Sequence, residues 1–453
     1  MKNFIKTLFA VIFGNAIFFG VFFFIMVLLI VGASMSGKDS KKLNIPSNAI
    51  LKLNISEGLS DMPQNKEFSF GNNEDETMSA SIYEVIDGIE KAKSDDNIKA
   101  MWIPLNGNSS LSYAQLDLLR KAIANFKTSK KPVLAYGEVV SQKMYYLACL
   151  ADKLYVNPNG GMDIRGFGAQ LQFFKNTLDK LEITPQIFYA GKFKSATEPL
   201  RLDKMSDENK QQTRELLSDI SKNVITNIAK DRKLTDSNVI NAINQMQSSI
   251  PNDALAAKLI DGEKYVDEVE GELRKMLRFS EDEKLNFTSI KNYISENEDA
   301  KKKGDIAVYV AEGDIIDGKS TESSIGSATV VSDLRKMAED DNIHAVVLRI
   351  NSPGGSALAS AVMLREIDLL KKKKPVVVSM GNVAASGGYY IASSGNKIFA
   401  ESNTITGSIG VFGIIPNIGN LLKNKLGVTF DEVELNDHAV MGINKEFEPL
   451  EAA

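Results

Sequence analysis

The stretch Lys374-Pro-Val-Val-Val-Ser-Met-Gly-Asn-Val-Ala-Ala-Ser-Gly-Gly-Tyr-Tyr390 is typical of a buried strand that runs into a turn of small residues and then into a helix. On its N-terminal side, short apolar runs alternate with helical patterns. Strands that alternate with helices predict an α/β domain with a largely parallel sheet. The predicted strands are 306–310, 345–350 and 375–379, and the predicted helices are 332–339 and 357–373.

The same pattern has a counterpart earlier in the chain. Residues 131–137 match residues 374–381, and Asp96–Asn106 matches Asp341–Asn351. The offset stays between 243 and 245 residues, which is far too long for a solenoid repeat and indicates a tandem domain duplication. Within the first repeat, the polar stretch Ser206–Gln247 has a helical period and is predicted to form a helical arm. The expected boundaries are a first repeat at 47–294, a linker at 295–304 and a second repeat at 305–453.

The N-terminus predicts a membrane anchor at residues 1–36. Residues 7–36 contain no charged side chain, and the apolar segment 8–33 has 26 residues where roughly 20 cross a bilayer as a helix. A cleaved signal peptide is the alternative, but its apolar region is shorter. Lysines lie on both sides of the span, so counting charges does not decide its orientation.

Composition excludes several classes of protein. The net charge of −5 argues against a nucleic-acid binder. Cys149 is the single cysteine, so no intrachain disulfide forms and a Cys2His2 zinc site is impossible. We find no motif for a metal or cofactor and expect none.

Two small-residue motifs suggest nucleophilic chemistry. Ser386 is expected near a helix N-terminus, where free N–H groups favour a developing negative charge, although a capping serine in a tight turn fits the motif as well. The loop Asn351–Gly355 follows a predicted strand. Its proline and two glycines can point successive N–H groups at an oxyanion, or can form an ordinary turn.

A serine nucleophile needs a base, and histidine is scarce. His344 precedes a strand and His438 lies in a polar stretch, so a Ser-His-Asp triad is not expected. A lysine can serve only when it is neutral, which requires burial or nearby positive charge. The chain has 53 Lys and Arg residues, and composition does not select one.

Taken together, the motifs resemble signal peptide peptidase A, also called protease IV, in its long tandem-domain form. The resemblance runs from the N-terminal segment to about residue 440. Its motifs are Ser-Pro-Gly-Gly at 352–355, Ala-Ala-Ser-Gly-Gly-Tyr at 384–389, Thr-Gly-Ser-Ile-Gly at 406–410 and Gly-Lys-Phe-Lys-Ser-Ala-Thr-Glu-Pro at 191–199.

The resemblance implies a role for each site residue. These are Ser386 as nucleophile, Lys194 rather than Lys192 as base, Ser408 as support for the lysine amine, and Gly354 and Gly355 as the oxyanion site. In the first repeat, Gln142 stands where Ser386 stands in the second, so one site is expected to be assembled from both repeats.

The resemblance also implies fold, substrate and location. The fold is the spiral α/β fold of crotonases and the Clp protease. The enzyme is a serine endopeptidase that degrades hydrophobic peptides, chiefly cleaved signal peptides. It has one transmembrane helix in the inner (plasma) membrane, an extracytoplasmic catalytic domain and a homotetrameric assembly.

Two other functions remain open at this stage. A crotonase-type acyl-CoA enzyme shares the fold and the oxyanion loop. An inactive peptide-binding scaffold is the second. In the first repeat Glu198-Pro-Leu200 leads into the helical arm, but Glu448-Pro-Leu450 stands three residues before the last residue given, so the second repeat is expected to be truncated.

Overall fold

The computed structural model describes residues 14–15, 18–26, 45–55, 59–62, 80–107, 109–296, 304–448 and 450–451. The chain divides into two compact units, Met1–Ile45 and Pro46–Ala453, each described here by itself. In the smaller unit, residues 14–15 and 18–26 are helical. Most of the predicted span 8–33 lies outside the described residues, and within them we find no helix whose length and hydropathy would let it cross a bilayer.

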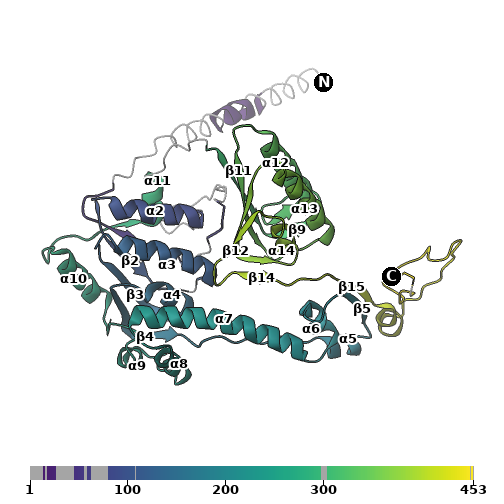
Figure 1. Ribbon diagram of the computed structural model, residues 1–453, viewed down its shortest axis with the longest axis horizontal. Coiled ribbons are helices and arrows are strands. Elements are labelled where there is room, and N and C mark those ends of the chain that lie inside the picture. The colour runs from purple at the N-terminus through teal and green to yellow at the C-terminus, as the bar shows by residue number, and fades with distance from the viewer. Residues whose placement is uncertain are drawn as a thin grey trace, which may run out of the picture. The chain divides into compact units, whose positions relative to one another are not determined.

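The first half of the larger unit, residues 46–296, is built on a six-stranded parallel sheet (Figure 1). The strand order is β6-β4-β3-β2-β1-β7. The strands are β1 (Ala49–Lys52), β2 (Ile98–Pro104), β3 (Val133–Ser141), β4 (Lys153–Asp163), β6 (Gly262–Glu263) and β7 (Asn286–Ser289).

Ten α-helices and one short 3-10 helix, Ser195–Thr197, are described in this half. The first two begin at capping boxes, in which Ser81 pairs with Glu84 and Ser112 pairs with Gln115. The helical arm predicted at 206–247 is two helices, α7 and α8. The helices are α2 (Ile82–Ser94), α3 (Tyr113–Lys127), α4 (Gln142–Ala148), α5 (Lys175–Lys180), α6 (Glu198–Arg201), α7 (Asp207–Arg232), α8 (Asp236–Asn244), α9 (Pro251–Ala256), α10 (Val266–Leu277) and α11 (Ile290–Glu296).

The second half, residues 304–451, has its own parallel sheet in the order β13-β12-β11-β8, with β14 paired to β12. The prediction of an α/β fold with parallel sheets is confirmed. The sheet strands are β8 (Ile306–Glu312), β11 (Ala345–Ser352), β12 (Val376–Ala385), β13 (Lys397–Phe399) and β14 (Ile405–Gly407). A separate parallel pair is β9 (Asp314–Ile316) with β10 (Ser324–Gly326), and the helices are α12 (Ser327–Glu339), α13 (Ala357–Lys371) and α14 (Gly387–Ala392).

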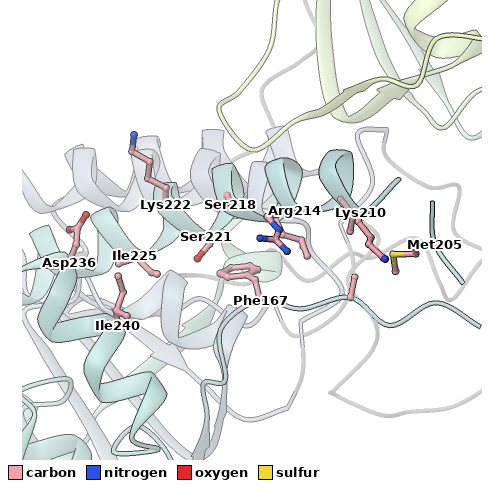
Figure 2. Close-up of a pocket in the computed structure, with 13 residues that line it drawn as sticks. Phe167, Met205, Lys210, Arg214, Ser218, Ser221, Lys222, Ile225, Asp236 and Ile240 are labelled. Carbon is pink, nitrogen blue, oxygen red and sulfur yellow. The ribbon is translucent and has the colours of Figure 1, made fainter. Parts of the chain in front are cut away.

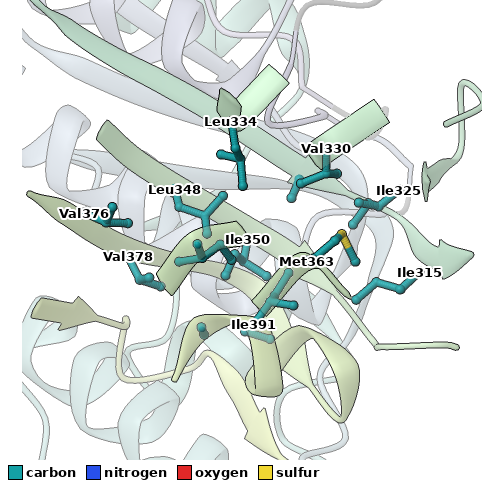
Figure 3. Close-up of a cluster of buried hydrophobic side chains, with 14 of the residues drawn as sticks. Ile315, Ile325, Val330, Leu334, Leu348, Ile350, Met363, Val376, Val378 and Ile391 are labelled. Carbon is teal, nitrogen blue, oxygen red and sulfur yellow. The ribbon is translucent and has the colours of Figure 1, made fainter. Parts of the chain in front are cut away.

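The core of the second half lies where α12, α13 and α14 pack on β11 and β12 (Figure 3). The valines that predicted a buried strand, Val376 and Val378, are fully buried there. Beside them lie Leu348 and Ile350 from β11 and Met363 from α13. Packing on this scale fixes the position of the loops that follow the strands.

The strand that leads to Ser386 is longer than predicted. The sequence suggested a strand at 375–379 and a turn after it, but β12 continues to Ala385. Between the pairs Ile350↔Met380 and Ser352↔Ala384 it bulges away from β11. The side chain of Asn351 fills the bulge, because its Oδ1 accepts the N–H of Val383 at 3.2 Å. Small residues thus form a bulged strand end where local pattern suggested a turn.

A two-stranded ribbon joins the halves. Strand β5 (Thr184–Tyr189) from the first half pairs antiparallel with β15 (Phe412–Asn417) from the second, and the two lie side by side in Figure 1. A short π-helix, η2 (Leu421–Lys425), follows β15. The ribbon carries chain segments from both halves to the same place.

Candidate active site

Ser386 sits between β12 and α14 in a strained backbone conformation. Its φ of 52° and ψ of −119° are rarely adopted by a residue with a side chain. Hydrogen bonds on both sides hold it there: its N–H donates to Gly407 O at 2.8 Å, and its carbonyl accepts the N–H of Tyr390 at 2.8 Å. A capping serine needs no such strain, so the conformation favours a functional role.

Lys194 reaches Ser386 from the other half of the chain. The ribbon pairs Tyr189 with Phe412, and the chain then turns at Gly191 into the segment that carries Lys194. The lysine is 4% exposed, and its Nζ lies 3.2 Å from Ser386 Oγ. Lys192, the alternative base, is exposed. The structure therefore brings Lys194, and not its neighbour, to the serine.

Ser408 lies beside both residues for a topological reason. Strand β14 pairs parallel with the end of β12, so that Gly407 faces Ala385 and the next residues, Ser408 and Ser386, emerge together. Lys194 Nζ lies 3.0 Å from Ser408 Oγ and donates to Ser408 O at 2.6 Å. The three predicted residues thus form one cluster.

The site favours a neutral lysine. Burial lowers the pKa of Lys194 below its ordinary value. Within the described ranges, no carboxylate pairs with its amine to oppose that shift. The nearby Glu198 is buried but is bound elsewhere, to Ser206 and Asn209. The ring of Phe412 lies 6.0 Å from Nζ, at the outer limit of a cation–π contact.

The two predicted oxyanion glycines differ in what they offer. The N–H of Gly354 already donates to Ser352 Oγ at 3.1 Å. Gly355 forms a parallel bridge with Ile315, in which the hydrogen bonds are made by its neighbours, Gly354 O and Ser356 N–H. The N–H of Gly355 itself therefore points away from β9. Gly354 contributes by lacking a side chain, because a Cβ there would lie 2.6 Å from the N of Gly387 and 2.7 Å from Ser386 Cβ.

Gly387 is a candidate oxyanion donor that the sequence analysis did not name. Its N–H is the first of α14, directly after Ser386, and the missing side chain of Gly354 leaves room in front of it. The N–H of the residue after a nucleophile at a helix start is a natural oxyanion donor. Its position directly after Ser386 is the sequence signal that could have identified it.

The matching place in the first half holds a structural contact. Strand β4 pairs with β3 so that Asp163 faces Ser141, as Gly407 faces Ala385 in the second half. Gln142 follows Ser141, and its Oε1 accepts the N–H groups of Arg165 and Gly166 at 3.1 and 2.8 Å. An amide therefore bridges the two chain segments where the second half has its serine cluster.

An open pocket of about 570 Å³ lies elsewhere, between α7, α8 and Phe167 (Figure 2). Its lining combines apolar side chains such as Ile225 and Ile240 with the cations Lys210 and Arg214. None of the predicted site residues lines it.

Comparison with known proteins matches most of the chain. Residues 125–279 and 368–452 match the sequence pattern of peptidase family S49, and residues 298–405 match that of Clp protease. Protease 4 of Haemophilus influenzae is 35% identical over 94% of this chain and 71% of its own length. The chloroplastic serine protease SPPA of Arabidopsis thaliana is 33% identical over 82% of this chain and 55% of its own. A solved enoyl-CoA hydratase/isomerase family member overlaps 16% of this chain and 36% of its own at 21% identity, but its TM-score of 0.15 carries no weight.

Proposed function

Because the chain belongs to peptidase family S49 and is a serine-type peptidase, we propose that Ser386 is its nucleophile and Lys194 its general base. The observation that carries this proposal is the 3.2 Å approach of a buried lysine amine to a strained serine hydroxyl. The acyl-CoA alternative has no support from the family, and a scaffold role does not require the strain at Ser386.

The hydrogen-bonding capacity of a neutral amine matches its three neighbours. A neutral amine has two N–H donors and one lone pair. In the proposed ground state it donates to Ser408 O and Ser408 Oγ, and its lone pair accepts the proton of Ser386 Oγ. Ser408 therefore orients the lone pair toward the hydroxyl.

The reaction proceeds through an acyl-enzyme. Ser386 Oγ attacks the peptide carbonyl carbon while its proton passes to Lys194 Nζ. The N–H groups of Gly355 and Gly387 stabilise the oxyanion of the tetrahedral intermediate. The lysine ammonium then protonates the departing amine, and the neutral lysine removes a proton from the water that hydrolyses the ester.

The substrate proposed is a hydrophobic peptide, chiefly a signal peptide left after export. Apolar side chains exposed around the serine cluster support this: Phe193 and Phe412 are 48% and 46% exposed, and Ile409 and Val411 are 75% and 59% exposed. An extended apolar peptide would cover them on binding. We further propose an anchor at 8–33, an extracytoplasmic catalytic unit and a homotetramer.

A fluorophosphonate probe tests the nucleophile directly. It forms a covalent bond with an activated serine, so the intact protein should be labelled at Ser386, as located by peptide mass spectrometry. Ser386→Ala should abolish both labelling and peptide hydrolysis while the protein stays folded. A Ser386→Ala protein that still hydrolyses peptides would overturn the assignment.

A further inference from the structure

A buried ion pair joins the first half of the chain to the strand end that leads to the nucleophile. Arg349, on β11, is 5% exposed, and Asp61, in the described segment 59–62, is 3% exposed. Arg349 Nε donates to Asp61 Oδ2 at 2.8 Å, and its Nη2 donates to Oδ1 at 3.4 Å. The ring of Tyr83, on α2, lies 5.5 Å from the guanidinium carbon. The first half thus supplies an anion and an aromatic cover for one arginine of the second.

The third nitrogen of the guanidinium, Nη1, binds β12. Arg349 Nη1 donates to the carbonyl of Met380 at 2.7 Å and to Ser379 Oγ at 3.0 Å. Met380 is the last residue paired with β11 before the bulge. The arginine therefore ties Asp61 to the point where β12 leaves its neighbour and heads for Ser386.

A second route closes the network. Asn351, whose side chain fills the bulge, donates from Nδ2 to Glu312 Oε1 at 2.9 Å. Glu312 Oε2 accepts the N–H of Asp61 at 3.0 Å. Asn351 also immediately precedes the loop Ser352–Gly355. The network therefore touches both segments of the site, the one that carries the nucleophile and the one that carries the oxyanion glycines.

The first half shows that a bulge does not need this ion pair. There, β3 gains one residue relative to β2 between the pair Pro104↔Tyr136 and the bridge Gly107↔Val140, and Asn106 Oδ1 accepts the N–H of Glu138 at 3.1 Å. The residue that matches Arg349 by strand pairing is Pro104, which has no charge. Of the two described sheets, only the one whose strand end leads to the serine cluster has this ion pair at the matching position.

We infer that Asp61 and Arg349 are positioning residues, which set the geometry between Ser386 and the Gly354–Gly355 loop by holding the bulge of β12 against the first half. The inference rests on the proposed nucleophile. Both side chains are almost fully buried and are not expected to touch substrate, so their loss should slow the chemical step more than it weakens binding. A misplacement of about 1 Å in a site of this kind can reduce the rate by roughly 100-fold.

Three variants test the inference. Asp61→Asn removes the charge with little change in volume. Arg349→Lys keeps a charge for Asp61 but lacks the fork that also reaches Met380. Asp261→Asn is the control, because it breaks an ion pair of similar length with Arg232 (2.9 Å), between α7 and the segment before β6. The measurements are kcat and KM on a peptide ester, the fluorophosphonate labelling rate and the melting temperature.

We expect Asp61→Asn to lower kcat by about tenfold or more and Arg349→Lys by about threefold or more, with KM changed less than about threefold. The control, Asp261→Asn, should keep kcat within about twofold of the parent even if its melting temperature falls as far as that of Asp61→Asn. Should Asp61→Asn fail to fold, Arg349→Lys decides. Either variant, folded and labelled as fast as the control, would overturn the inference. Ser386→Ala, measured alongside, tests the nucleophile independently, since its loss of labelling does not depend on Asp61.

Discussion

Lys192 and Lys194 stand two residues apart, yet only Lys194 is buried against the serines. Lys194→Arg keeps a cation that cannot deprotonate, so it should lower kcat/KM by at least about 10³-fold. Lys192→Arg is the control and should retain activity within about twofold of the parent. Peptide-ester hydrolysis by the two purified variants measures the difference. An active Lys194→Arg enzyme would contradict the proposed dyad.

The lowered pKa of Lys194 has two consequences for pH dependence. The neutral amine is the proposed base, so kcat/KM should rise with pH through a value below the ordinary lysine pKa of about 10.4. Between the folded and unfolded pKa values the unfolded chain binds more protons, so stability should also rise with pH across that interval. A comparison of melting curves of the parent and Lys194→Met at several pH values isolates the contribution of Lys194 to the pH dependence of stability. The parent should gain melting temperature relative to the variant as pH increases, and an unchanged difference would contradict a lowered pKa.

Gly354 is predicted to be indispensable because of its missing side chain. Its φ is +103°, and a Cβ would crowd Gly387 N at 2.6 Å. Gly354→Ala should therefore lower kcat by about 100-fold, because its methyl group would obstruct the N–H of Gly387, the proposed oxyanion donor. Gly318→Ala is matched in backbone strain, with a φ of +83°, but a Cβ there meets no atom within 4 Å. Equal activity of the two variants in the peptide-ester assay would argue against the oxyanion role.

At the scale of elements, β14 is held from two directions. It pairs with β12 on one side, and the loop before it is tied to the first half by Asn403, whose Nδ2 donates to Asp117 Oδ2 on α3 at 2.7 Å. Asp117 in turn accepts the hydroxyl of Tyr146, on α4, at 2.5 Å. Since Ser408 follows β14, this loop contributes to the orientation of the lysine amine.

Asn403→Ala should loosen that loop and lower kcat by about tenfold, with a smaller effect on KM. Asn223→Ala is the control, because Asn223 reaches the same loop through longer contacts of 3.3 and 3.4 Å. It should remain within about twofold of the parent. Steady-state kinetics at a temperature where both variants are folded, as judged by circular dichroism, compares them. Equal kcat values would show that β12 alone positions Ser408.

At the scale of the whole molecule, the proposed membrane anchor and the proposed orientation of the catalytic unit can be tested together. With the anchor at 8–33 and the catalytic unit outside the cytoplasm, protease added to sealed spheroplasts should degrade residues 46–453. A cytoplasmic reporter enzyme is the control and should survive until the cells are lysed. Survival of the catalytic unit in intact spheroplasts would contradict the proposed orientation.

The sequence alone predicted the fold better than it predicted the site. Short apolar runs identified β8, β11 and only the first part of β12, Val376–Ser379, because burial on both faces of a parallel sheet leaves a local signal. No local signal selected one base among 53 lysines and arginines, and Lys194 came from family resemblance. The pairing of β5 with β15 that places it is a contact between distant segments. Asp61 was missed for the same reason, since its partner lies 288 residues away.

The ribbon of β5 and β15 also sets when the enzyme can first act during its own synthesis. Lys194 and Ser386 are separated by 192 residues, and their approach requires β15, which is translated later still. At about 5–20 residues per second, roughly 10–40 s pass between the two residues leaving the ribosome's catalytic centre. A nascent chain therefore lacks the proposed base–nucleophile pair until β15 has been synthesised and has paired with β5.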